Sequence, residues 1–257
     1  MLQNRYKLSE ISVSRISNSL WRRATNILRY IFTLTEKTGP IEKTTRDTCV
    51  LVANGPSLNM VDLDALEGHH VFGMNRIYLN DDLKGRLKGI FLVNELVAQQ
   101  FANDFMTLDC NLYVPLTLSK YFGKATERII YSRFNPLRGG FGAQSRLHIN
   151  PGTTVTYYAL QILLEMGYRK VIIIGMDHDF GVQNKVNHEE VVIKDNAHFD
   201  PNYFPPGSKW DTPDILGNEY WYTVARHHYE KNGALIVDAT INGKCKIFVK
   251  SALDKEL

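Results

Sequence analysis

Short runs of consecutive apolar residues recur along the chain from residue 48 onward, and polar or turn residues end each of them. The most continuous runs lie within residues 50–53, 70–74, 89–93 and 169–175, and residues 171–174 are all apolar. They are too short for buried helices and do not alternate with polar residues, so they predict strands that are buried on both faces of a sheet. Further strands are predicted at residues 111–114, 128–131, 234–237 and, at an edge, 245–249.

Helical patterns separate these strands. Residues 155–166 are apolar on most faces, which predicts a buried helix with Thr153 or Thr154 as its N-cap and Gly167 at its end. Residues 220–231 predict a second helix. An alternation of apolar strands and helices is typical of parallel sheets built from right-handed crossovers. We therefore expect an α/β protein with a Rossmann-like parallel sheet flanked by helices.

Two stretches fall outside this alternation. Residues 1–47 combine an excess of Lys and Arg with interleaved apolar side chains, and Gly39 and Pro40 mark a linker near their end. This pattern fits a basic amphipathic helix on an anionic membrane surface, or a helix that packs on the main domain with its basic face in water. Residues 178–218 are polar and aromatic, and we expect them to form a lid. The chain thus divides into an N-terminal helical segment, 1–47, and one domain, 48–257.

Net charge, cysteine content and hydropathy limit the partners and the compartment that we expect for this protein. The formal net charge of the 257 residues is +3, which is too small to argue for nucleic acid. Cys49, Cys110 and Cys245 are widely spaced and match neither a zinc site nor a disulfide framework, which favours a reducing compartment. No apolar run is long enough to span a bilayer. We expect a cytoplasmic protein, in peripheral contact with the inner face of the cytoplasmic membrane if residues 1–47 bind it.

The end of the first predicted strand carries the clearest ligand signal. Residues 54–58 read Asn-Gly-Pro-Ser-Leu, which predicts a tight turn into a helix N-terminus, where backbone N–H groups favour anions. Gly55 permits a positive φ and lets a ligand approach the backbone. The next two strands end near Asn75 and Asn94, so these side chains and Asn54 would form a polar rim over a ligand crevice. The alternative is an ordinary turn.

Asp177-His178-Asp179 follows the most apolar strand and offers acid–base or metal chemistry. An Asp-X-Asp pair after a strand can hold Mg²⁺ or Mn²⁺ against a diphosphate. The alternative is that Asp177 caps a turn and anchors neighbouring loops. His178, His188 and His198 are general-base candidates, because imidazole titrates near neutral pH.

Taken together, these motifs resemble a known family. The chain is similar to the bacterial sialyltransferases of glycosyltransferase family forty-two in Val-Ala-Asn-Gly-Pro-Ser-Leu at residues 52–58, Asn75, Asn94, the helix from Thr154 and the strand ending Gly-Met-Asp at residues 175–177. It looks even more like the related domain of Maf-type flagellin glycosylation proteins, which is also similar to archaeal 6-hydroxymethylpterin diphosphokinases. The Maf-like features lie at residues 177–180, 197–199, 203–204 and 238–240. The resemblance covers about residues 48–250.

The resemblance implies a GT-A-like variant of the Rossmann arrangement and a transferase that binds a CMP-activated nine-carbon acid sugar. In such a transferase, Asn54, Gly55 and Ser57 would approach the phosphate and ribose. Asn75 and Asn94 would hold the ribose or the donor sugar.

The same resemblance implies roles for residues further along the chain. Thr153 and Thr154 would lie near the base or the sugar carboxylate, His198 would be the general base, and Tyr203 would bind the departing phosphate. The sialyltransferases require no metal, whereas His178 and Asp179 follow the Maf-like or kinase-like pattern.

We therefore expect a glycosyltransferase that moves a nonulosonic (sialic-type) acid from a CMP-activated donor to a cell-surface glycan, such as lipopolysaccharide, or to flagellin. The main alternative is a Mg²⁺-dependent diphosphokinase that transfers pyrophosphate from ATP to 6-hydroxymethylpterin, with the metal on Asp177 and Asp179. A third interpretation is a nucleotide-binding scaffold without catalysis.

Overall fold

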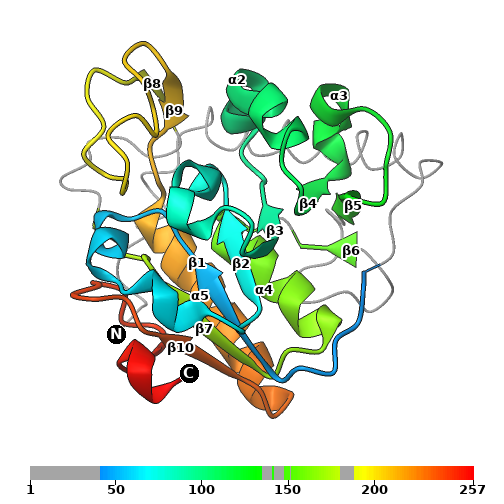
Figure 1. The fold of residues 1–257 in the computed structure, drawn as a ribbon, viewed down its shortest axis with the longest axis vertical. Coiled ribbons are helices and arrows are strands. Elements are labelled where there is room, and N and C mark those ends of the chain that lie inside the picture. The colour runs from blue at the N-terminus through cyan, green and yellow to red at the C-terminus, as the bar shows by residue number, and fades with distance from the viewer. Residues whose placement is uncertain (1–40, 135–140, 142–147, 151, 180–187) are drawn as a thin grey trace, which may run out of the picture.

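The computed structural model describes residues 41–134, 141, 148–150, 152–179 and 188–257, which Figure 1 draws in colour. Most of the basic N-terminal segment lies outside the described residues, so the membrane-binding helix stays a prediction. Among the helices that the structure describes, none is both long and apolar enough to cross a membrane.

Within the described residues, nine parallel strands form the central sheet, in the order β11-β10-β7-β1-β2-β3-β4-β5-β6 (Figure 1). The strands are β1 (Thr48–Val52), β2 (Val71–Met74), β3 (Leu87–Phe91), β4 (Asn111–Pro115), β5 (Ile129–Phe134), β6 (His148–Ile149), β7 (Lys170–Ile174), β10 (Leu235–Asp238) and β11 (Val249–Lys250). Helices flank the sheet, and the Rossmann-like α/β arrangement predicted from the sequence is confirmed.

The direction in which the chain adds strands to the sheet reverses between β1 and β7. From β1 the chain moves outward strand by strand to β6, and α4 (Val155–Met166) then carries it back to β7, on the other side of β1. The connections after β1 and β7 therefore lead to opposite sides of the sheet. In open α/β sheets, the crevice at the carboxyl ends of two such strands is where ligands bind.

Apolar side chains cover both faces of the sheet. In β1, Cys49 and Leu51 pack with α4 and α5 (Ile215–Lys231) on one face. Val50 and Val52 belong to a second cluster on the other face, which includes α2 (Glu95–Met106). Burial on both sides explains why the strand sequences are continuously apolar.

The sequence predicted both long helices in the second half of the chain, and the predicted bounds of α4 match the structure. The Thr154 hydroxyl accepts a hydrogen bond from the Tyr157 N–H at the start of α4, and Gly167 follows its end with a φ of 111°. Helix α5 begins earlier than the predicted residues 220–231, because the Asp214 carboxylate accepts from the Gly217 N–H and caps it there.

The turn after β1 differs from the expectation. It enters a 3-10 helix of five residues, η2 (Pro56–Met60), and Gly55 is its N-cap with a φ of −72°. The expected α-helix N-terminus and the positive φ at Gly55 were therefore wrong. The other short helices are α3 (Ser119–Phe122), η3 (Leu63–Leu66), η4 (Ile77–Leu79), η5 (Asp81–Leu83), η6 (Leu116–Leu118) and η7 (Leu253–Lys255).

The stretch predicted as a lid contains ordered and well-packed parts. Its strands β8 (Glu189–Val191) and β9 (Lys209–Asp211) form an antiparallel pair outside the main sheet. Between them, Phe199, Tyr203 and Phe204 are buried in the cluster that also holds Val50 and Val52. This middle part of the stretch is therefore anchored to the domain by aromatic packing.

Candidate active site

A cavity of about 180 Å³ lies at the carboxyl ends of β1, β2 and β7. Eight residues that the sequence singled out line it: Asn54, Gly55, Asn75, Thr154, Asp177, His178, Asp179 and His198. Its position between β1 and β7 is the switch point of the sheet. Four other predicted residues, Ser57, Asn94, Thr153 and Tyr203, do not line the cavity.

Two asparagines in the wall of the cavity each have a buried amide oxygen without a partner among the described residues. The Asn54 Nδ2 donates a hydrogen bond of 2.9 Å to the Met74 carbonyl oxygen, which fixes the orientation of the amide. Asn75 follows β2 in the left-handed region, with a φ of 47°. The Oδ1 atoms of both asparagines are buried and accept no hydrogen bond from the described residues. A buried acceptor is costly to leave unpaired, so this wall favours a ligand that offers N–H or O–H groups.

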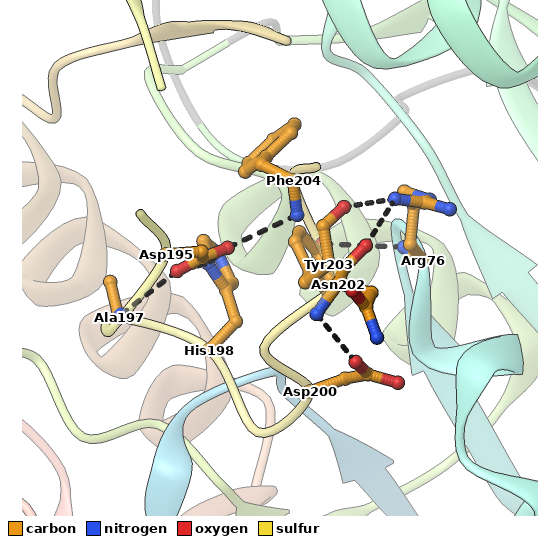
Figure 2. A network of polar contacts seen from close by, with 8 residues as sticks. All are labelled: Arg76, Asp195, Ala197, His198, Asp200, Asn202, Tyr203 and Phe204. Carbon is orange, nitrogen blue, oxygen red and sulfur yellow. Dashed lines mark hydrogen bonds and ion pairs between the residues drawn. The ribbon is translucent and has the colours of Figure 1, made fainter. Parts of the chain in front are cut away.

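His198 forms a pair with a carboxylate that the sequence analysis did not single out. The ring Nδ1 lies 2.8 and 3.0 Å from the two carboxylate oxygens of Asp195 (Figure 2). The side chain of Asp195 is only 4% exposed, and it also accepts hydrogen bonds from the backbone N–H groups of Ala197 and Phe204. Since Nδ1 donates to Asp195, Nε2 is the ring nitrogen that can accept a proton.

Opposing effects act on the pKa of Asp195. Burial raises it, whereas the hydrogen bond and charge of His198 and the two backbone N–H groups lower it, and the net result is a lowered pKa. Asp195 therefore stays ionised beside the imidazole. The signal in the sequence was an Asp three residues before the His, which is too common a spacing to stand out.

Asp177 anchors the turn after β1, as the alternative interpretation proposed. Its carboxylate accepts hydrogen bonds from the Ser57 hydroxyl at 2.7 Å and from the Ser57 N–H at 3.2 and 3.3 Å. A Cβ on Gly55 would lie 1.9 Å from Asp177 Oδ2. The chain thus needs glycine at this position so that its own carboxylate can reach the turn, and the Ser57 groups expected to meet a phosphate already hold Asp177.

The other two residues of Asp177-His178-Asp179 also have partners within the chain. Asp179 Oδ2 lies 2.5 Å from Lys244 Nζ. His178 Nε2 lies 3.4 Å from Glu219 Oε1, and its side chain is buried. No group of three or more potential metal-ligating side chains occurs among the described residues. The predicted metal site on Asp177 and Asp179 stays a prediction.

The remaining predicted residues stabilise the elements around the cavity. The Asn94 side chain caps α2 by accepting from the Val97 N–H at 3.2 Å. The Thr153 hydroxyl donates to Asn218 Oδ1 at 2.9 Å and so joins the start of α4 to α5. His188 is exposed and does not line the cavity.

Tyr203 is buried and packs against the His198 ring. Its ring stacks on the imidazole with centroids 3.8 Å apart and planes 3° from parallel. Burial raises the pKa of the Tyr203 phenol, which keeps it neutral. Tyr203 therefore contacts the candidate base, and does not line the wall where a phosphate was expected.

Comparison with known proteins adds no family. No protein-family model matches the sequence, and no curated protein matches it either.

Proposed function

We propose that the protein is a glycosyltransferase that binds a nucleotide-activated sugar in the cavity between β1 and β7. One observation carries the proposal: a histidine held by a buried carboxylate shares this cavity with two asparagines whose Oδ1 atoms have no partner. Ribose and sugar hydroxyls and the amino group of cytosine are donors that would satisfy such oxygens. Together with the motif resemblance, this favours a CMP-activated nonulosonic acid as the donor substrate.

The proposed chemistry is displacement at the anomeric carbon of the donor. His198 Nε2 takes the proton of an acceptor hydroxyl, and the acceptor oxygen forms a bond to the anomeric carbon. The bond between that carbon and the phosphate oxygen breaks, and CMP leaves with the bonding electron pair. Asp195 stabilises the imidazolium that forms. The N-terminus of α4, at Thr154, lines the same cavity and favours the negative charge of the departing phosphate.

We further propose that the acceptor is a cell-surface glycan or flagellin, met on the cytoplasmic side. The excess of Lys and Arg in residues 1–47 supports contact with the anionic inner face of the membrane.

The experiment that tests this function compares His198→Ala with His227→Ala, an exposed histidine of α5 that does not line the cavity. With CMP-activated nonulosonic acids and membrane glycans or flagellin, His198→Ala should lower kcat by at least about 100-fold, because the general base is lost. Its affinity for CMP should change little, and His227→Ala should behave as the wild type. Full transfer by His198→Ala would exclude the proposed base.

Metal dependence separates the transferase from the diphosphokinase. Transfer from a CMP-activated sugar should continue in excess EDTA, because the departing phosphate is stabilised by the protein alone in the proposed chemistry. A Mg²⁺-dependent reaction with ATP and 6-hydroxymethylpterin that stops on addition of EDTA would instead identify the kinase.

A further inference from the structure

Arg76, directly after Asn75, carries a guanidinium that is almost fully buried. Its side chain is 6% exposed. The Nε donates to the Tyr78 hydroxyl at 3.0 Å, and the guanidinium carbon lies 3.6 Å from the centre of the Phe101 ring. A buried guanidinium destabilises the folded state unless its N–H groups donate hydrogen bonds. The acceptors of the Arg76 guanidinium are therefore contacts that the folded state needs.

The guanidinium holds one short segment of the chain. Its Nη1 donates to the carbonyl oxygens of Asn202, at 3.3 Å, and Tyr203 (Figure 2). The nearest carboxylate, Asp104, is half exposed and lies 3.7 Å from Nη2. The direct bonds of Arg76 therefore go mainly to residues that lie between β8 and β9, more than a hundred positions later in the sequence.

The segment that contains Asn202 and Tyr203 also contacts His198, the candidate base. The Tyr203 ring stacks on the His198 ring, and the Arg76 backbone N–H donates to the Tyr203 hydroxyl at 3.3 Å. The next residue, Phe204, donates its backbone N–H to Asp195. Figure 2 shows Tyr203 between Arg76 and His198, with Asp195 next to the imidazole.

We propose that Arg76 is a positioning residue for His198: by fixing the backbone and hydroxyl of Tyr203, it holds the aromatic face that keeps the imidazole in place beside Asp195. Arg76 does not line the cavity, so it acts on the base and not on the substrate. The kinetic consequence rests on the proposed function, whereas the structural consequence does not.

The structural consequence is tested by NMR on the ring protons of His198, assigned by their absence in His198→Ala. Lysine keeps the charge of Arg76 but lacks the planar fork that reaches several acceptors and stacks on Phe101. In Arg76→Lys we expect the His198 signals to move, because the Tyr203 ring no longer lies at a fixed place over the imidazole. The matched control is Arg86→Lys, whose parent arginine makes partly exposed contacts with Leu63 and Asp64 and should leave the His198 signals unchanged.

A second variant covers the case in which Arg76→Lys does not fold. Tyr203→Phe keeps the stacked ring and removes only the hydroxyl, which accepts from the Arg76 backbone N–H and also bonds to the Asn75 side chain. It should move the same His198 signals in the same direction, by less. If the His198 signals of both variants match those of the wild type, or if those of Arg86→Lys move as far, the positioning role is wrong.

Kinetics supply the second test. Misplacing a catalytic group by about 1 Å can cost roughly 100-fold, so Arg76→Lys should lower kcat of sugar transfer by up to that factor, with little change in the KM of the donor. An unchanged kcat in Arg76→Lys together with an inactive His198→Ala would overturn the positioning role and leave the transferase intact. If the wild type transfers no sugar, the proposed function fails and the NMR shifts alone decide the role of Arg76.

Discussion

Asp195 shows how one buried carboxylate can orient a base and also link stability to pH. Its oxygens receive the His198 Nδ1 and two backbone N–H groups, from Ala197 and Phe204. These bonds hold its pKa below the ordinary value against the effect of burial. An acid whose pKa is lowered in the folded state stabilises that state above its unfolded pKa, and this contribution is lost as the pH falls through the folded pKa.

We predict that Asp195→Asn lowers the free energy of unfolding by about 2 kcal/mol at pH 7, since it removes hydrogen bonds to a charged group. The difference from the wild type should shrink as the pH falls below the ordinary value of 3.8, where the wild-type carboxylate becomes protonated as well. Urea unfolding at a series of pH values measures this. The exposed Asp82→Asn is the control and should show a much smaller difference. A pH-independent difference for Asp195→Asn would contradict the linkage.

The sequence identified Asn54, Asn75 and Asp177 but missed Asp195 and Arg76. Asn54 and Asn75 stood out because each closes an apolar strand, and the strands meet at one edge of the sheet. Asp195 and Arg76 are single charges in irregular stretches, and such charges usually face water. Only their burial and their partners far along the chain, such as Asn202 for Arg76, separate them from surface residues.

At the scale of elements, the turn between β1 and η2 packs closely against the residues that follow β7. The φ of Gly55 is −72°, which any residue can adopt. Glycine is therefore needed at this position because there is no room for a Cβ, and not because of the backbone conformation. An added Cβ would meet Asp177 Oδ2 at 1.9 Å and the Gly175 carbonyl oxygen at 2.7 Å. The second neighbour is backbone and cannot move aside as a side chain can.

We therefore predict that Gly55→Ala destabilises the protein by more than about 2 kcal/mol, because it forces β1 and β7 apart at their carboxyl ends. Gly85→Ala is the matched control: its φ of 76° is unfavourable for alanine, but the space around it is open. It should cost only about 1 kcal/mol. Denaturant unfolding of both variants measures the difference. Equal losses would contradict the steric role of Gly55, because both Asp177 and the Gly175 backbone would then have to move away from the turn at little cost.

Elements that are buried over most of their surface could be predicted, and elements that bury only a few side chains could not, even where a cap is present, as Asn94 is for α2. The run at residues 169–175 and the caps Thr154 and Gly167 led directly to β7 and α4. Helix α2 was missed, since only Val97, Ala98 and Phe105 of its residues are buried and its backbone is non-helical at Phe101. Strands β8 and β9 are largely exposed, so no alternation of apolar residues marks them.

At the scale of the whole molecule, the order of the strands brings the site together. Parallel strands were expected from the apolar runs, but the sequence contains no signal for the return of the chain to β7 beside β1. This return places residues from β2, α4 and α5 and from the turns that follow β1 and β7 around one cavity. A ligand there would contact elements from both halves of the sheet, so its binding free energy would add to the stability of the entire domain.

Because the cavity joins both halves of the sheet, a bound nucleotide should raise the thermal stability of the domain. CMP at about 100 times its Kd should stabilise the folded protein by about 2.7 kcal/mol, which corresponds to a rise in Tm of roughly 5–10 °C for a domain of this size. In Asn75→Gly the backbone should be kept, because glycine accepts the φ of 47° and the backbone bond to Phe91 remains. The Tm without ligand should fall only by a small amount, from loss of the side-chain hydrogen bond to the Tyr203 hydroxyl. The rise with CMP should shrink, since the unpaired Oδ1 is gone. Thermal unfolding with CMP, and with inorganic phosphate as the control ligand, measures both effects. If neither CMP nor any other nucleotide raises the Tm of the wild type, the cavity between β1 and β7 does not bind an activated sugar.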